Sequence, residues 1–174
     1  MPDIISNKFQ LRKFMQRVLN ELDMDPSRAS AAFDEWLLAH PSLRTLAVFS
    51  PLPGEVNLSA SVRNRPDIDW LYPRVCGESL TFHHGNLFVS GAFGILEPTY
   101  NSPEVPIVQI DAFICPGLAF ERNGSRLGRG RGFYDRTLVH SRKDALKVGV
   151  CFERQIVSNT FAENHDIPMD VVIF

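Results

Sequence analysis

The sequence has few cysteines, and none of them is placed as metal sites usually require. Cys76, Cys115 and Cys151 are the three thiols among 174 residues, and they stand far apart with no CxxC pair. This spacing excludes the common zinc knuckles and disulfide frameworks. We therefore expect a reducing compartment, and the cytoplasm fits best.

Long apolar runs are also missing. No stretch approaches the roughly 18 apolar residues that a membrane-spanning helix needs. The first residues, Met-Pro-Asp-Ile-Ile-Ser-Asn-Lys, lack the basic segment and apolar core of an export signal. We expect neither a membrane segment nor secretion.

The chain has no strong excess of either charge. Eighteen lysines and arginines face 20 acidic residues, for a net charge of -2. This balance argues against wholesale electrostatic binding of nucleic acid or anionic lipid. A local basic site stays possible, because five arginines fall in one short window: Arg122, Arg126, Arg129, Arg131 and Arg136. The length predicts one compact domain with one site.

Apolar spacing predicts alternating helices and strands. A helix capped by Ser6 or Asn7 should run to about Leu22, and Asp25-Pro26 should open a second one that ends at His40-Pro41. Strands are expected at 45–50, 70–75, 105–115 and 147–152, helices from 57 and over 133–143, a hairpin turn at 85–86, a loop at 93–106 and an apolar tail at 171–174. This order predicts a three-layer α/β domain whose site lies at the carboxyl ends of its strands.

A glycine- and arginine-rich segment, residues 116–135, joins a predicted strand to a predicted helix. Its glycines could turn backbone N–H groups toward an anion, and its arginines suit phosphate oxygens. It lacks the Gly-Lys-Ser/Thr ending of a Walker A loop, and its third glycine comes one residue early for the GxGxxG fingerprint. An anion site, a solvated turn and an RGG-like nucleic-acid tract all fit these residues, and the flanking apolar elements make the tract the weakest of the three.

The string PGLAFERNGSRLGRGRGFYDRTL resembles the signature of the 5-formyltetrahydrofolate cyclo-ligase family. The resemblance extends, through shorter matches, over nearly the whole chain. It implies a single domain over residues 1–174 and a Rossmann-like α/β fold with a mainly parallel sheet and helices on both faces. It also implies an enzyme that uses ATP and Mg²⁺ to convert 5-formyltetrahydrofolate to 5,10-methenyltetrahydrofolate.

The resemblance also implies which residues bind ATP. Lys8 and Arg12 match an N-terminal K-x-x-x-R that contacts the phosphates, and positions four apart share one helix face. The glycine-rich segment supplies the other nucleotide contacts: Arg126, Gly128, Arg129, Gly130, Arg131, Gly132, Phe133 and Tyr134. Among these, Arg126, Arg129 and Tyr134 are the implied catalytic residues.

For the folate, the resemblance implies contacts with Ser50, Glu55, Arg74 and Phe93. A Glu55 carboxylate could accept hydrogen bonds from the N–H groups of the pterin, and a ring at position 93 could stack on the substrate. Two positions depart from the family pattern, because Phe133 replaces a frequent tyrosine and some relatives have an apolar residue in place of Ser50.

Asp135 and Asp166 match the implied magnesium ligands, although Asp170 is close enough in sequence to replace Asp166. Carboxylates suit this hard cation. His83-His84 could suggest a metal pair, but adjacent strand residues point to opposite faces, so we interpret them as ordinary hairpin residues.

The implied reaction needs no side-chain nucleophile, since ATP activates the formyl oxygen. The expected partners are small molecules, with no nucleic acid and no membrane, and the expected state is a monomer. Three alternatives stay open: another ATP-using enzyme on the same scaffold, a silent folate or nucleotide binder, and an RNA-binding module built on the arginine cluster.

Overall fold

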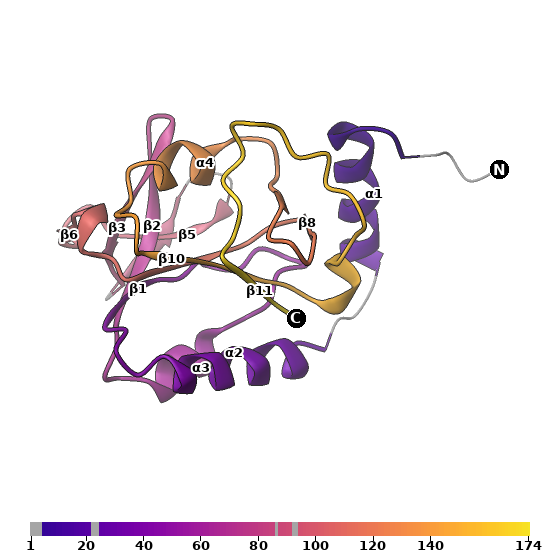
Figure 1. Cartoon of the computed structure of the whole chain (residues 1–174). Coiled ribbons are helices and arrows are strands. Elements are labelled where there is room, and N and C mark those ends of the chain that lie inside the picture. Colours follow the sequence, from indigo (N-terminus) through magenta and orange to yellow (C-terminus); the bar gives the residue numbers. More distant parts are fainter. Residues whose placement is uncertain (1–4, 22–24, 86, 92–93) are drawn as a thin grey trace.

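A computed structural model describes residues 5–21, 25–85, 87–91 and 94–174. A seven-stranded sheet forms its centre (Figure 1). In spatial order the strands are β11 (Val171–Ile173), β10 (Leu146–Val150), β7 (Ala112–Cys115), β1 (Thr45–Ala47), β2 (Asp69–Cys76), β3 (Ser79–His84) and β6 (Glu104–Val105). The five strands from β11 to β2 pair in parallel, whereas β3 and β6 pair antiparallel. The predicted, mainly parallel sheet is confirmed.

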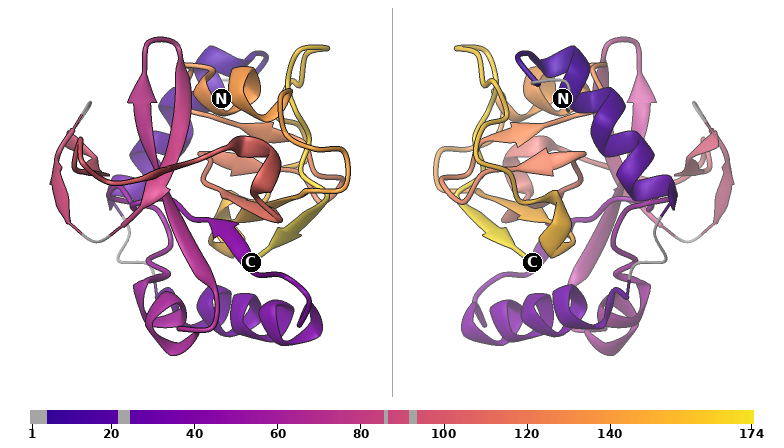
Figure 2. Two further views of the ribbon diagram at one scale, coloured as in Figure 1. Left: turned by 90° about the vertical axis from the view of Figure 1, so that its left-hand side faces the viewer. Right: turned by 90° about the vertical axis from the view of Figure 1, so that its right-hand side faces the viewer.

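Helices cover both faces of this sheet. Helices α2 (Ser27–Ala39) and α3 (Ser59–Asn64) lie on one side, and α1 (Lys8–Glu21) and α4 (Phe133–Leu138) lie on the other (Figure 2). The three-layer α/β prediction is therefore confirmed. None of the helices in the described ranges is long and apolar enough to cross a membrane.

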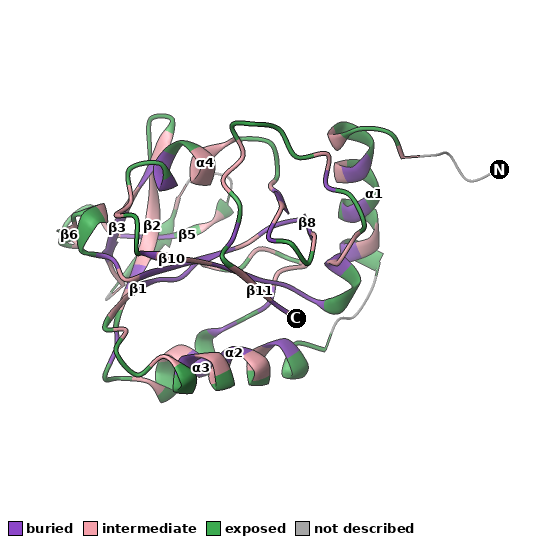
Figure 3. Ribbon diagram, viewed as in Figure 1, coloured by how far each residue is buried: buried purple, intermediate pink, exposed green. Residues whose placement is uncertain are grey.

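The buried residues form separate cores on the two sides of the sheet. Phe33 and Leu37 of α2 pack against sheet residues such as Ile114, whereas Leu138 of α4 packs with Phe113 on the opposite face. Buried positions follow the sheet and the inner helix faces, while the outer helix faces are exposed (Figure 3). Burial of this apolar surface holds the layers together.

Helix α1 packs on a two-stranded ribbon, formed by β8 (Ala119–Phe120) and β9 (Arg126–Leu127). Its buried face, Leu11, Met15 and Leu19, contacts Leu118, Ala119 and Leu127. The ribbon belongs to the glycine- and arginine-rich segment, in which no strand was predicted. As a result, the N-terminal helix lies beside the residues that follow the ribbon.

The predicted helix starts are present. The Asn7 side chain accepts a hydrogen bond from the backbone N–H of Gln10 at 3.0 Å, so Asn7, of the two candidates, caps α1. The Asp25 carboxylate accepts one from the N–H of Ser27 at 2.9 Å. Both caps satisfy donors that a helix leaves free in its first turn.

The predicted hairpin turn at residues 85–86 is wrong. Strand β3 pairs with β2 over six residues and with β6 at the edge, and the hairpin turns instead at Gly77-Glu78. Gly77 has φ +59°, a conformation that favours glycine and suits a tight turn. Strand β4 (Phe88–Ser90) pairs with β5 (Leu96–Pro98) in a separate small sheet, and Asn86 lies outside the described residues.

Several predicted boundaries are also corrected. The expected loop over 93–106 contains β5 and β6, and the expected strand over 105–115 is reduced to β7 because Pro106 lacks an N–H group and a 3-10 helix, Ile107–Gln109, follows it. Strand β1 ends at Ala47, before residue 50, and α4 ends at Leu138, before residue 143. Strand β10 confirms a strand in the region 147–152 but ends at Val150, and a 3-10 helix, Glu153–Gln155, follows.

Candidate active site

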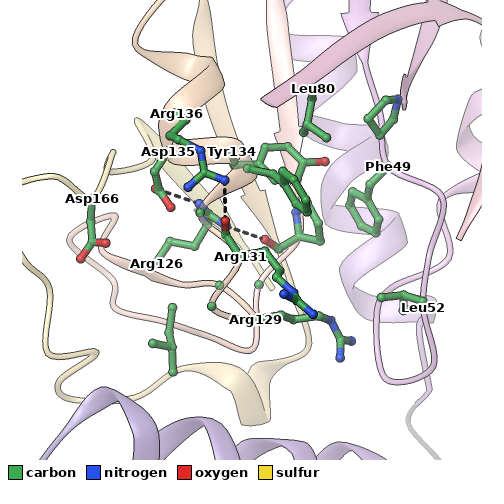
Figure 4. A pocket seen from close by; sticks show the side chains of 18 of the residues that line it. Phe49, Leu52, Leu80, Arg126, Arg129, Arg131, Tyr134, Asp135, Arg136 and Asp166 are labelled. Carbon is green, nitrogen blue, oxygen red and sulfur yellow. Dashed lines mark hydrogen bonds and ion pairs between the residues drawn. The ribbon is translucent and has the colours of Figure 1, made fainter. Parts of the chain in front are cut away.

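A cleft of about 1060 Å³ opens beside the glycine- and arginine-rich segment. Ser50, beyond the carboxyl end of β1, and Pro116-Gly117, directly after β7, contribute to its wall. The carboxyl ends of parallel strands are the expected place for a site in this architecture. Figure 4 shows the side chains of the segment on one side of the cleft and Phe49, Leu52 and Leu80 on the other.

The structure brings most of the predicted site residues together in this cleft. They are Lys8, Arg12, Ser50, Glu55, Arg126, Gly128, Arg129, Gly130, Arg131, Gly132, Phe133, Tyr134, Asp135 and Asp166. Residues separated by more than 150 positions thus share one site. Two predicted folate contacts are exceptions. Phe93 lies outside the described residues, and Arg74 is not among the residues that line the cleft.

Arg74 instead ties β2 to the segment after β5. Its guanidinium donates hydrogen bonds to the carbonyl oxygens of Pro98 and Thr99 and lies 5.3 Å from the ring centroid of Tyr100. These contacts use Nε and one terminal nitrogen of the guanidinium, and they give Arg74 a role in holding the small sheet.

Arg126 is a buried cation at the base of the cleft. Its side chain is 4% exposed and donates to Asp135 Oδ1 at 3.0 Å and to the Pro116 carbonyl at 3.2 Å. The guanidinium also lies 5.4 Å from the Tyr134 ring centroid, within the range of a cation–π contact. Its Nε atom is buried without a partner among the described residues. The surrounding groups therefore fix one positive charge in the site.

Arg12 fixes the backbone of the glycine-rich loop. Its Nε donates to the Gly128 carbonyl at 3.0 Å, which joins α1 to the loop. Gly130 has φ +98°, and only glycine adopts such a conformation without strain. The Arg12 side chain lies about 3.4 Å from where a Cβ of Gly130 would stand. The loop is thus held close to the N-terminal helix.

Arg129 reaches across the cleft to Glu55. The two side chains are 3.0 Å apart, and Arg129 also lies 3.4 Å from the Pro53 carbonyl. The second Glu55 oxygen accepts the N–H of Leu52 at 2.9 Å. Burial raises the pKa of Glu55, although Leu52 and Arg129 favour its charged form. The pair links a predicted phosphate contact directly to a predicted folate contact.

Tyr134 is a protonated hydroxyl at neutral pH. Burial raises its pKa well above the usual value, against the opposing effect of Arg126. It can therefore donate a hydrogen bond but does not supply a phenolate. Cys115, behind the site, is fully buried, and burial raises its pKa to about 12. That thiol is neutral and enclosed, which makes it a poor nucleophile.

Two carboxylates suited to a hard cation line the cleft. Asp135 uses Oδ1 to accept hydrogen bonds from Arg126 and from the N–H of Ile167, while its Oδ2 has no partner among the described residues. Asp166 Oδ2 accepts from Lys8 Nζ at 2.6 Å. These oxygens fit the ligand preference of Mg²⁺.

The structure separates the two alternatives for the second aspartate. Asp166 lines the cleft, but Asp170 does not. Asp170 accepts the N–H of Lys147 at 2.7 Å and so supports the start of β10.

The sequence analysis missed two neighbours of Asp166. One ligand atom each from Glu163, His165 and Asp166 lies within 4.8 Å of the others, and the spacing Glu-x-His-Asp is the signal that could have indicated them.

Lys8 stands between these acidic groups. Its Nζ lies 2.6 Å from Asp166 and 2.8 Å from Glu163. Burial opposes its protonation, but the two carboxylates outweigh this effect and raise the pKa of Lys8. Lys8 therefore carries a positive charge at neutral pH, which a phosphate contact requires. Its partners in this structure are acidic side chains.

The other half of the cleft is mainly apolar and was missed by the sequence analysis. It is lined by Phe49, Leu52, Pro53, Pro73, Val75, Leu80, Ile95 and Glu97. These residues come from four separate stretches of chain. Their grouping follows from the pairing of β2 with β3 and from the packing of β5 against β2, which the sequence pattern did not predict.

Comparison with known proteins identifies the family. The sequence profile of the 5-formyltetrahydrofolate cyclo-ligase family matches residues 67–174 of this chain. A protein of Escherichia coli K12 named 5-formyltetrahydrofolate cyclo-ligase is 32% identical over 139 residues, which cover 74% of this chain and 76% of that protein. This chain belongs to the cyclo-ligase family. The glycine- and arginine-rich segment and the acidic residues after it lie within the matched region.

Other relatives agree with this assignment. The Haemophilus influenzae protein of the same name is 40% identical over 84 residues, or 47% of this chain. The chain spans about half the length of the first relatives that it matches. The matched part covers 45% of the Haemophilus influenzae protein and 44% of the Mycolicibacterium smegmatis protein. The structure of Aquifex aeolicus 5,10-methenyltetrahydrofolate synthetase is 30% identical with a TM-score of 0.80, over 95% of this chain and 88% of that one.

Proposed function

We propose that this protein converts 5-formyltetrahydrofolate to 5,10-methenyltetrahydrofolate, with consumption of ATP and release of ADP and phosphate. Membership of the cyclo-ligase family supports the folate reaction. The observation that carries the proposal is the contact between Arg129 and Glu55 at 3.0 Å. It places a group suited to phosphate beside one suited to a pterin, as transfer of a phosphoryl group to a folate requires.

The proposed chemistry activates a poor leaving group. The formyl oxygen attacks the γ-phosphorus of ATP, the bond to ADP breaks, and the oxygen becomes a phosphate ester on an iminium carbon. The N10 lone pair then attacks that carbon and closes the five-membered ring. The carbon–oxygen bond breaks with its electron pair on the departing phosphate, and the N10 proton passes to solvent.

The residues of the cleft supply charge and position for this chemistry. Arg126 is held by Asp135 and by the Pro116 carbonyl, so it offers a fixed positive charge to the transferring phosphoryl group. Arg129 and Lys8 reach the same group by exchanging their carboxylate partners for phosphate oxygens. Fixed charges of this kind stabilise a transition state without further reorganisation.

Asp135 and Asp166 would hold Mg²⁺, which when bound supplies positive charge to the phosphate oxygens. Tyr134, kept protonated by burial, donates a hydrogen bond to an oxygen of the reacting group. No side-chain nucleophile is needed. We further propose that the protein is a cytoplasmic monomer whose partners are these small molecules.

A coupled assay tests the function. Purified protein is mixed with 5-formyltetrahydrofolate and ATP, with and without magnesium, and the near-ultraviolet absorbance of the methenyl product is followed together with ADP release. Both signals should rise one for one, and only when magnesium and both substrates are present. ADP release without the methenyl product would indicate a different ATP-using enzyme, and binding of both ligands without either signal would indicate a silent binder.

A further inference from the structure

Glu97 is a carboxylate of the cleft that the proposed mechanism does not use. It lies on β5 with 8% of its surface exposed, and it lines the apolar half of the cleft. Among the described residues, its carboxylate accepts one long hydrogen bond, 3.4 Å from the Val75 N–H to Oε1. No cation among the described residues pairs with it, and Oε2 accepts no hydrogen bond there.

The Glu97 side chain is largely enclosed, and local packing holds its carboxylate in place. A Cβ on Gly91 would stand 2.3 Å from Glu97 Cδ, so the close approach of this backbone fixes the carboxylate. A carboxylate kept with unused acceptors beside a cleft suits a ligand that brings donors.

Glu55 differs from Glu97 in this respect. Both Glu55 oxygens are occupied, one by Arg129 and the other by the N–H of Leu52. No donor among the described residues reaches Glu97 Oε2, so Glu97 retains acceptor capacity beside the cleft. The walls around it, Pro73, Val75, Leu80 and Ile95, are apolar and suit the face of a flat ring.

We propose that Glu97 is a substrate-recognition residue that accepts hydrogen bonds from the N–H groups of the pteridine ring. The inference rests on the proposed function and adds a residue to its folate contacts. A reduced pteridine combines a flat body with N–H donors along its edge, and a carboxylate presents two acceptors to such an edge. Ligand binding would then bring hydrogen-bond donors to this carboxylate.

The test compares Glu97→Gln with the wild type and with Glu104→Gln. The substitution at position 97 preserves shape and removes the charge, and Glu104 is an exposed residue of β6 outside the cleft. Calorimetry without ATP measures binding of tetrahydrofolate and of p-aminobenzoylglutamate, which lacks the pteridine. Glu97→Gln should weaken tetrahydrofolate binding about tenfold or more, the effect of losing hydrogen bonds to a charged group. Binding of the fragment should not change.

Two further measurements separate recognition from structure. The KM for ATP should stay at the wild-type value, and stability in urea should be close to that of the wild type because the substitution preserves the shape of the side chain. Glu104→Gln should match the wild type in every assay. Equal tetrahydrofolate affinity in Glu97→Gln and wild type would overturn this inference alone, as would an equal loss of ATP affinity. Failure of the wild type to bind or convert folate would overturn the proposed function as well.

Discussion

The two halves of the cleft are prepared for ligands in different ways. One half is lined by Lys8 and by the arginines of the glycine- and arginine-rich segment, and we refer to it as the cationic half. Its charged groups already have partners, because Arg126 pairs with Asp135 and Lys8 pairs with Asp166. In the apolar half, packing fixes the wall, and Glu97 has one long hydrogen bond. A phosphate or a metal ion would therefore compete with existing ion pairs, whereas a heterocyclic ring would bring donors to a carboxylate that has few partners among the described residues.

This difference predicts which measurements respond to substitution. Groups that exchange partners as charge moves should affect turnover, because their interactions strengthen in the transition state. Groups that complete a hydrogen-bond set on binding should affect affinity. Arg129 and Glu55 connect the halves through one contact of 3.0 Å, and changes there should affect both.

The largest expected effect is on turnover in the cationic half. Arg129→Ala should lower kcat by a factor on the order of 10² or more, because it removes a guanidinium charge that stabilises the transferring phosphoryl group in the proposed mechanism. Steady-state kinetics with both substrates saturating measures this loss. Arg122→Ala is the matched control, because Arg122 lies outside the cleft and stacks on Phe174. Near-normal kcat in Arg129→Ala would remove this residue from the mechanism.

A second test asks whether the acidic residues of the cationic half hold the metal. Asp135→Asn and Asp166→Asn should each raise the magnesium concentration needed for half-maximal activity by about tenfold or more, since metal-site substitutions commonly have effects of that size. Asp170→Asn should leave that requirement unchanged, because Asp170 supports β10 outside the cleft. A magnesium titration of the four proteins decides the matter. A shift in Asp170→Asn alone would reverse the assignment of the second aspartate.

The sequence predicted the cationic half far better than the apolar half. Helix caps at Asn7 and Asp25 and the alternation of helices and strands are local signals, and they gave the layers of the fold. The cationic residues are concentrated in one continuous segment and in Lys8 and Arg12, so a resemblance in sequence was enough to indicate them. The cleft then confirmed their proximity.

The apolar half depends on strand pairing, which local patterns do not fix. Gly85-Asn86 favoured a hairpin, but β3 pairs with β2 and β6, while β4 pairs with β5. With these pairings, β5 packs against β2, and Glu97 reaches Val75 and the cleft. Arg74 illustrates the same limit, because its position in sequence suggested a folate contact and its donors instead hold the chain after β5.

The smallest expected effect concerns pH and the contact between the halves. Because burial raises the pKa of Glu55, this carboxyl gains a proton at a higher pH than an ordinary glutamate does. Protonation removes the charge that holds Arg129, so kcat/KM for the folate should fall as pH decreases through the raised pKa. The expected change is about fivefold or less, since an ion pair with a half-exposed partner contributes about 1 kcal/mol or less.

Stability should change in the opposite direction over the same range of pH. Between the usual value of 4.5 and the raised pKa, the folded protein binds more protons at Glu55 than the unfolded chain does, so the free energy of unfolding falls as pH rises. Glu55→Gln has no proton to gain and should lose both dependences. Parallel profiles for wild type and Glu55→Gln, in kinetics and in urea unfolding, would contradict the assignment. Divergent profiles of opposite sign would show that Glu55 retains its charge for function at a cost to the fold.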